Sequence, residues 1–345
     1  MRGDTPTLAE IAREAGVSTP TVSKVLNGRA DVAPATRTRV EELLQRHGYR
    51  RRAGGPASRL FDLVFHEVES AWAMEVIRGV QNVARQEKLH VVLSESGGAL
   101  SPGQSWVDGV LARRPCGVVL VLSDLDAAQR VQLASRDIPF VVLDPAGDPA
   151  EGVPAVGTNN WLGGVTATRH LIDLGHRRIG LIGGPSRMLC SRARLDGYRA
   201  ALETAGLAFD PRLIREGDFH FEAGYSAGRD LLSLAQPPSA VFAGNDLQAL
   251  GLYEAARELG LRIPADLSVI GFDDLPLARW VGPPLTTIRQ PLVAMAETAA
   301  RLALSLGRGD RPATTRVDLA TSLVIRHSTA PPPWSLPGEP PDCRT

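Results

Sequence analysis

Hydroxyl side chains and a lysine gather near the amino terminus, in the segment Thr19-Pro20-Thr21-Val22-Ser23-Lys24. Such groups hydrogen-bond to base edges and phosphate oxygens of DNA. Residues 1–59 carry eleven Lys/Arg against six acids, a net charge of +5, which leaves 27 bases and 32 acids, or −5, for the rest of the chain. A basic segment joined to an acidic body indicates that the basic segment binds a nucleic acid through its phosphate backbone. The alternative, an incidental bias in surface charge, is less favoured.

Side chains that would support catalysis or bind a metal do not cluster in this sequence. It contains no P-loop and no His-Glu-x-x-His motif. The three cysteines, Cys116, Cys190 and Cys343, match neither a disulfide framework nor zinc-ligand spacing. We therefore expect no enzymatic activity, no cofactor and no metal, and ordinary structural or surface roles for the scattered histidines His66, His170, His176 and His220.

A second group of polar residues follows short apolar runs in the body of the chain. Ligands of open parallel sheets bind beyond the carboxyl ends of the strands, so residues directly after such runs are candidates for a pocket. The candidates are His66, Glu67, Ser94, Asn245, Asp246, Asp273 and Asp274.

The amino-terminal polar segment needs helices to position it. Thr7 and Glu10 have the spacing of a capping box, which predicts a helix over about residues 8–15. Gly16 then permits the tight turn that ends a helix, and Ser18 can cap a second helix. The pattern is helix, turn, helix.

The second helix accommodates Pro20 because a proline in the first turn removes no internal hydrogen bond. A third helix, over about Pro34 to His47, would complete a small core. In such a unit the second helix enters the major groove of DNA, although three short helices can also form an inert bundle.

From Leu60 onward, apolar runs alternate with helical patterns, which predicts parallel sheets wrapped by helices. The runs are 61–65, 91–93, 118–122, 140–143, 179–182, 240–243 and 267–271. A body of this length favours two lobes with a cleft. The expected fold is thus an all-α helix-turn-helix head (1–50) and a two-lobed α/β core with parallel sheets (61–327). Between them lies a basic Gly/Pro linker (51–60), and a proline-rich tail (328–345) is expected to be disordered.

Several segments together resemble the LacI/GalR family of repressors. In the head these are Thr7 to Ser18, Thr21 to Gly28, and Gly48-Tyr49; in the body, Leu174 to Gly180, Arg194 to Tyr198, Gly244-Asn245-Asp246, Gly271 to Asp274, and Pro284 to Ile288. The resemblance spans about residues 5 to 327 and implies a periplasmic-binding-protein-like core.

The resemblance also implies which residues contact DNA. Thr19, Pro20 and Lys24 would read bases, and Pro20 could do so only through an apolar contact such as a thymine methyl group. The residues expected to hold the DNA backbone or to flank it are Thr7, Ser18, Thr21, Ser23, Asn27, Thr36, Tyr49, Arg51 and Arg52. Relatives usually continue into a hinge helix that enters the minor groove, whereas Gly54-Gly55-Pro56 would break a helix here. The arginines beside it would lie along phosphates, enter a narrow minor groove or simply form a linker.

For the effector, matching positions nominate Trp72, Asn160, Arg194, Phe219, Asn245 and Asp273. Flat aromatic faces and fixed donors and acceptors suit a sugar. Each side chain has a structural alternative, namely an ion pair for Arg194, a loop cap for Asp273 and core packing for the two aromatic residues. Asn159 stands where relatives commonly carry Asp, and Glu67 where an Asp is frequent, so the choice of ligand can differ.

The expected protein is a cytoplasmic homodimer that binds a palindromic operator in double-stranded DNA and represses carbohydrate-utilisation genes, with a sugar as effector. Two alternatives stay open at this point: a co-repressor-dependent regulator that senses a non-sugar metabolite, and a pure solute-binding protein, against which the head argues.

Overall fold

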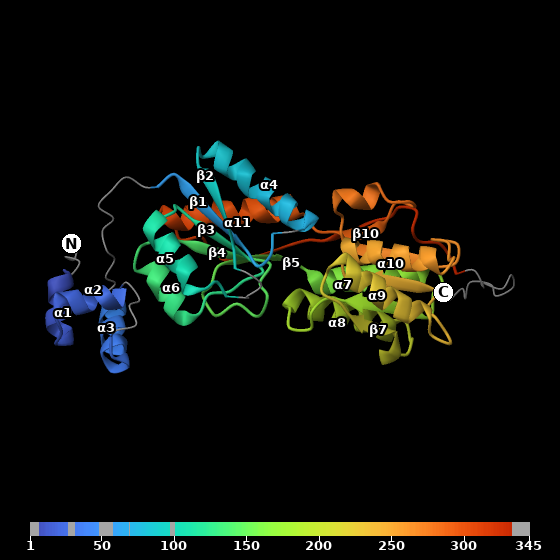
Figure 1. Ribbon diagram of the computed structural model, residues 1–345, viewed down its shortest axis with the longest axis horizontal. Coiled ribbons are helices and arrows are strands. Elements are labelled where there is room, and N and C mark those ends of the chain that lie inside the picture. The colour runs from blue at the N-terminus through green and yellow to red at the C-terminus, as the bar shows by residue number, and fades with distance from the viewer. Residues whose placement is uncertain (1–6, 27–31, 48–57, 69, 97–100, 333–345) are drawn as a thin grey trace.

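The computed structural model describes residues 7–26, 32–47, 58–68, 70–96 and 101–332. These residues form three parts that lie in a row in Figure 1: a small helical head, lobe 1 and lobe 2. The predicted fold class, a helical head with a two-lobed α/β core, is confirmed. In the described part of the chain, no helix is long and apolar enough to cross a lipid bilayer.

The head contains the three helices that the sequence predicts, α1 (Leu8–Ala15), α2 (Thr19–Leu26) and α3 (Pro34–Arg46). The Thr7 hydroxyl accepts a hydrogen bond from the Glu10 amide, and the Glu10 carboxylate accepts one from the Thr7 amide, which completes the capping box. Gly16 ends α1 with a φ of +68°, in the left-handed region that glycine tolerates best. Buried side chains from all three helices, such as Ile11, Val22 and Val40, form the head's own core.

Lobe 1 is built on a six-stranded parallel sheet in the order β11-β5-β4-β3-β1-β2. Its strands are β1 (Leu60–Phe65), β2 (His90–Glu95), β3 (Val118–Val121), β4 (Phe140–Leu143), β5 (Ala155–Thr158) and β11 (Arg316–Leu319). Helices α4 (Ala71–Gln86) and α11 (Leu292–Gly307) cover one face, and α5 (Gln104–Arg113) and α6 (Ala127–Ala134) cover the other (Figure 1). Because side chains alternate along a strand, Phe61, Leu63 and Phe65 pack toward α4 and α11, whereas Val64 packs toward α5.

Lobe 2 repeats this architecture with the order β12-β10-β9-β8-β6-β7, parallel except for the antiparallel pair β10–β12. Its strands are β6 (Ile179–Gly183), β7 (Ile214–Glu216), β8 (Ala240–Ala243), β9 (Ser268–Asp273), β10 (Thr286–Arg289) and β12 (Ser322–Val324). Helices α7 (Asn160–Asp173) and α8 (Leu189–Thr204) cover one face, and α9 (Phe221–Leu232) and α10 (Asp246–Glu258) cover the other. The short 3-10 helices η1 (Pro211–Leu213) and η2 (Pro276–Arg279) lie in connecting segments.

The chain passes between the two lobes three times within the described residues. It leaves lobe 1 after β5 to form α7, returns after β10 to form α11, and leaves again between β11 and β12. Thr158 ends β5 and Gln290 follows β10, so these two residues stand at the first two crossings. The position of one lobe relative to the other therefore depends on three short connections.

Two features differ from the sequence-based prediction. The apolar runs predicted β1, β2, β3, β4, β6, β8 and β9, but not the strands near the crossings, β5, β10, β11 and β12, nor the three-residue β7. The carboxyl-terminal tail was expected to begin at residue 328, yet Ser328 donates to the Val269 carbonyl at 2.6 Å and Ala330 accepts from His176 at 2.9 Å. These bonds hold residues 328–330 against lobe 2, and the expected tail from residue 333 lies outside the described residues.

Candidate functional site

A cavity of about 220 Å³ lies between the two lobes. This is somewhat below the range of about 300–1,000 Å³ that is common for small-molecule pockets. Lobe 1 contributes Phe65, His66, Glu67, Ser70, Trp72, Val121, Leu122 and Asp144. Lobe 2 contributes Pro185, Arg187, Met188, Cys190, Arg194, Asp218, Phe219, His220, Asn245, Leu247 and Asp273. A molecule bound here would contact both lobes at once.

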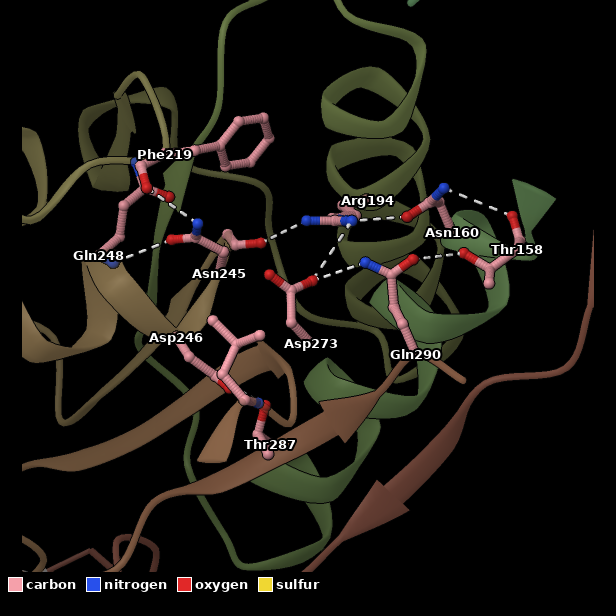
Figure 2. Close-up of polar contacts among 12 residues, drawn as sticks. Thr158, Asn160, Arg194, Phe219, Asn245, Asp246, Gln248, Asp273, Thr287 and Gln290 are labelled. Carbon is pink, nitrogen blue, oxygen red and sulfur yellow. Dashed lines mark hydrogen bonds and ion pairs between the residues drawn. The ribbon is translucent and has the colours of Figure 1, made fainter. Parts of the chain in front are cut away.

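Arg194 is a polar group of this cavity that two hydrogen bonds and an aromatic ring hold in place. It projects from α8, and its guanidinium carbon lies 3.7 Å from the ring centre of Phe272. Its Nε donates to Oδ1 of Asn160 at 2.9 Å and its Nη1 donates to the Gly244 carbonyl at 2.6 Å (Figure 2). A guanidinium has five N–H donors, so donors remain for a bound molecule.

Asp273 lies next to Arg194 at the end of β9. Its φ of +113° is unusual for a residue with a side chain and directs the chain sharply out of the strand. Its Oδ1 accepts from Nε2 of Gln290 at 2.6 Å and lies 4.0 Å from Nη2 of Arg194. Burial raises the pKa of the Asp273 carboxyl to about 7, against the opposing effects of Arg194 and the Gln290 bond.

Phe219 presents an aromatic ring to the cavity from a backbone conformation that only a few non-glycine residues adopt, with a φ of +74°. Asn245 stabilises that backbone, because its Nδ2 donates to the Phe219 carbonyl at 2.9 Å. The Oδ1 of Asn245 accepts from the Gln248 amide at 2.9 Å and so caps α10. Gly184 supports the ring, since a Cβ there would lie 2.1 Å from it. The absence of a side chain at Gly184 therefore leaves the space that the Phe219 ring occupies.

The lobe 1 wall combines an aromatic residue with carboxylates. Trp72 is half-buried in the first turn of α4, whose amino terminus the Ser70 hydroxyl caps at 3.1 Å. Asp144 follows β4 and is buried, and burial raises the pKa of its carboxyl while Arg194 opposes that shift. Both side chains face lobe 2 residues across the same cavity.

An ion pair between His220 and Glu67 bridges the lobes beside the cavity. Nε2 of His220 in lobe 2 lies 3.4 Å from Oε2 of Glu67 in lobe 1. Burial lowers the pKa of His220, but the Asp218 and Glu67 carboxylates outweigh it and raise the pKa above its ordinary value. Protonated His220 thus favours a closed arrangement of the lobes, weakly because both side chains are partly exposed.

The structure brings together five of the six effector residues nominated from the sequence: Trp72, Arg194, Phe219, Asn245 and Asp273. Asn160 is not among the described residues that line the cavity and instead holds Arg194 from behind. Among the strand-end candidates, His66 and Glu67 line the cavity, and Ser94 does not belong to its described lining.

The other two strand-end aspartates have structural roles. Asp246 is buried and accepts hydrogen bonds from the Thr287 hydroxyl at 2.6 Å and the Leu275 amide at 2.7 Å. Asp274 pairs with Arg289 at 2.7 Å and with Arg326. Both carboxylates therefore join lobe 2 segments to one another and do not line the cavity.

Sequence reasoning did not find Asp144, Asp218 and His220. Asp144 directly follows the apolar run Phe140–Leu143, so the strand-end rule itself points to it. Asp218 and His220 follow β7, which has three residues and no strong apolar signal. Cys190 also lines the cavity, and burial raises the pKa of its thiol to about 12, so the thiol stays protonated and unreactive.

One stretch fits the Gly-x-Ser-x-Gly pattern of serine hydrolases, Gly224-Tyr225-Ser226-Ala227-Gly228. The expectation of no enzymatic activity did not take this stretch into account. That motif acts from a tight strand-to-helix turn, whereas this stretch lies inside α9. Ser226 is exposed, and a Cβ at Gly224 would lie 2.3 Å from the Gln248 carbonyl of α10. Its glycines thus allow two helices to pack closely and do not create a nucleophile.

A separate polar surface lies on α2 of the head. Thr19, Pro20 and Lys24 are exposed, whereas Val22 and Val25 are buried in the head core. Ser18 precedes this surface, and its hydroxyl lies 2.9 Å from that of Thr21. The exposed side of α2 therefore presents the residue types expected for contact with base edges.

The remaining residues expected to contact DNA are placed as follows. Ser23 is half-buried on α2, Thr36 is half-buried in the first turn of α3, and the Thr7 hydroxyl caps α1. Asn27, Tyr49, Arg51 and Arg52 lie outside the described residues, as does most of the linker expected at 51–60.

Comparison with known families gives two matches. Residues 7–52 match bacterial regulatory proteins of the lacI family, and residues 168–329 match a periplasmic binding protein-like domain. The HTH-type transcriptional repressor CytR of Escherichia coli strain K12 is 34% identical over 328 residues, which cover 94% of this chain and 96% of that repressor.

Two solved structures extend the likeness to three dimensions. The transcriptional regulator CelR–cellobiose complex superposes with a TM-score of 0.72 at 34% identity, covering 94% of this chain and 99% of that one. The lac repressor dimer bound to operator and the anti-inducer ONPF superposes with a TM-score of 0.69 at 29% identity, covering 95% and 100%.

Proposed function

Because the chain belongs to the LacI family of bacterial regulatory proteins, we propose that this DNA-binding transcriptional repressor controls carbohydrate-utilisation genes and that a sugar in the interlobe cavity modulates its operator binding. The family consists of transcriptional regulators and not of enzymes. Its members bind operator DNA as dimers and respond to small molecules.

The observation that carries the sugar assignment is the geometry of Arg194 and Asp273. A buried donor and a buried acceptor, 4.0 Å apart, face the same cavity. A hydroxyl group can donate to one and accept from the other, whereas a carboxylate would be repelled by Asp273 and an ammonium by Arg194. Trp72 and Phe219, from opposite lobes, provide flat apolar faces for a sugar ring. The related CelR was solved with cellobiose in complex.

The DNA partner follows from the head. Exposed Thr19, Pro20 and Lys24 on α2 support a role in base reading, with Thr7, Ser18, Thr21, Ser23 and Thr36 near the backbone. One head covers few base pairs, so a twofold dimer would read both halves of a palindromic operator. The related lac repressor was solved as a dimer bound to operator, which supports a homodimer here. Such a protein would act in the cytoplasm, where the DNA is.

We infer that the effector shifts an equilibrium between lobe arrangements. A ligand changes that equilibrium only by its difference in affinity for the two arrangements. The same fold supports release from DNA on binding, as an inducer causes, or tighter DNA binding, as a co-repressor causes. The alternative function, a regulator that responds to a non-sugar metabolite as co-repressor, would place a group with similar donors and acceptors between Arg194 and Asp273.

The test combines two measurements on the purified protein. Gel retardation at low salt with a palindromic fragment from its own promoter region should show a shifted complex. Calorimetry against a panel of mono- and oligosaccharides should then identify a ligand, and that ligand should change the retardation. Release would indicate an inducer and tighter retention a co-repressor. Failure to retard any palindromic fragment would contradict the regulator assignment, and binding of a non-sugar metabolite alone would contradict the sugar.

A further inference from the structure

Five residues around the cavity form a nearly closed circuit of polar contacts, in which Thr158 takes part through both its backbone carbonyl and its hydroxyl (Figure 2). Nε of Arg194 donates to Oδ1 of Asn160 at 2.9 Å, and Nδ2 of Asn160 donates to the Thr158 carbonyl at 3.4 Å. The Thr158 hydroxyl donates to Oε1 of Gln290 at 2.8 Å, and Nε2 of Gln290 donates to Oδ1 of Asp273 at 2.6 Å. We call this set the Arg194–Asp273 relay.

The relay consists of two hydrogen-bonded arms that meet at Thr158, one at its backbone carbonyl and one at its hydroxyl. The charged group at the outer end of each arm determines the direction of donation within it. A guanidinium can only donate, so Asn160 must present its oxygen to Arg194 and its nitrogen to Thr158. An ionised carboxylate can only accept, so Gln290 must present its nitrogen to Asp273 and its oxygen to Thr158. Both amide orientations therefore agree with the charges at the ends.

Apart from Thr158, where covalent bonds join the carbonyl to the hydroxyl, the circuit is open at the step between Arg194 and Asp273. Nη2 of Arg194 and Oδ1 of Asp273 are 4.0 Å apart, too far for a direct hydrogen bond. Both residues line the cavity, whereas Asn160 and Gln290 are not among its described lining residues. A ligand in the cavity thus has access to the open step, and the other steps lie behind it.

Two members of the relay lie where the chain crosses between the lobes. Thr158 is the last residue of β5, where the chain first leaves lobe 1, and Gln290 follows β10, where the chain returns. All five side chains are at most 8% exposed, so water competes little for their hydrogen bonds. The Thr158–Gln290 bond ties two interlobe crossings directly together.

We propose that Thr158 and Gln290 are positioning residues, and that a ligand hydroxyl closes the relay by accepting from Arg194 and donating to Asp273. When the ligand closes the relay, it affects the contacts of Thr158 and Gln290 at the two crossings. Occupancy of the cavity thereby changes the relative position of the lobes. This inference rests on the proposed effector function and adds the residues through which the effector acts.

The first test needs no ligand and uses the full chain. In Thr158→Val the hydroxyl that orients Gln290 is absent, the donor to Asp273 is no longer held, and the midpoint of Asp273 titration should rise by about one pH unit. Thr158→Ser retains the hydroxyl and should retain the midpoint. Thr168→Val is the matched control, since Thr168 is buried and its hydroxyl donates to the Gly164 carbonyl within its own helix. NMR of selectively labelled aspartate, with Asp273→Asn to assign the signal, measures the midpoint. An unchanged midpoint in Thr158→Val overturns the relay.

The second test measures the effect on DNA binding, with cellobiose and the other sugars of the panel as probes. The probe that shifts wild-type retardation should be needed at a concentration at least tenfold higher for Thr158→Val and for Gln290→Met, whereas Thr158→Ser and Thr168→Val should respond like wild type. Equal responses of all variants overturn the relay and leave the effector function intact. If no sugar of the panel changes the DNA retardation of the wild-type protein, the proposed function is overturned. The relay is then judged by the titration of Asp273 alone.

Discussion

Nδ2 of Asn245 donates to the backbone carbonyl of Phe219 at 2.9 Å, and the same side chain caps α10 through its Oδ1. One amide thus joins a helix start to the strained loop residue whose ring faces the cavity. Asn245 was nominated from the sequence as an effector contact. In the structure it also supports Phe219, a second nominated contact.

Replacing Asn245 separates these two roles. Asn245→Asp retains an oxygen that can cap α10 but loses the donor to Phe219, so effector affinity should fall about tenfold for the loss of one hydrogen bond of about 1.4 kcal/mol. Asn245→Ala loses both bonds and should also lower the unfolding free energy by about 1–2 kcal/mol. Calorimetry and denaturant unfolding measure the two effects. Equal stability losses in the two variants would argue against the separation.

Arg194→Lys should abolish the effector response without abolishing DNA retardation. Lysine keeps the charge but has neither the planar fork that bonds Asn160 and Gly244 nor the flat face that lies on Phe272. We expect at least a 100-fold loss of effector affinity, or about 2.7 kcal/mol. Arg199→Lys, on an exposed part of the same helix, is the control. Wild-type effector affinity in Arg194→Lys would remove this residue from the site.

Asp273→Asn should change how stability depends on pH. The pKa of Asp273 is about 7 in the folded protein and 3.8 is its ordinary value, so between these values the unfolded chain has lost a proton that the folded chain retains. The contribution of Asp273 to stability is therefore fully present below about pH 4 and is lost as pH rises to 7, by on the order of 1 kcal/mol per pH unit.

Across pH 4 to 7, Asp273→Asn should thus become steadily more stable relative to wild type in denaturant unfolding. Asp210→Asn provides the comparison, because the side-chain bond from Arg212 lowers the pKa of Asp210 and places its titration below this window. The difference between Asp210→Asn and wild type should be constant over the same range. A constant difference for Asp273→Asn as well would refute the raised pKa.

Gly184→Ala should weaken effector binding by displacing a ring. The new Cβ would lie 2.1–2.5 Å from three carbons of the Phe219 ring, so the ring must move, at a typical cost of about 1–3 kcal/mol for overpacking. Gly103→Ala is the control, since nothing lies within 4 Å of a Cβ there. Calorimetry should show a loss of affinity for Gly184→Ala alone. Full affinity in this variant would indicate that the ligand does not contact Phe219.

Lys24→Ala should weaken operator binding while effector affinity stays the same. Lys24 is exposed on α2, and a base contact is worth about 1–3 kcal/mol of discrimination between sequences. The loss should accordingly be larger for the operator fragment than for a scrambled fragment. Lys88→Ala, at an exposed position in the body, should leave both complexes unchanged. Parallel loss of DNA and effector affinity in Lys24→Ala would point to misfolding.

Local patterns predicted the head almost residue by residue. The Thr7–Glu10 capping box and the turn at Gly16 depend on neighbours within four residues, and α1 begins and ends where they place it. The central strands were predicted for a related reason, because strands buried on both faces are continuous apolar runs. Strand β11, Arg316–Leu319, was not predicted because it alternates exposed and half-buried residues at the edge of its sheet.

The sequence by itself therefore determined the helices of the head, the central strands of both sheets, the fold class and, through motif resemblance, five of the residues gathered at the cavity. Only the tertiary structure decided that Thr158, Asn160, Arg194, Asp273 and Gln290 meet in one relay, and that Asn160 stands behind the cavity wall. The physical reason is sequence separation. Thr158 and Gln290 are 132 residues apart, and their contact depends on where the chain crosses between the lobes, which no local periodicity encodes.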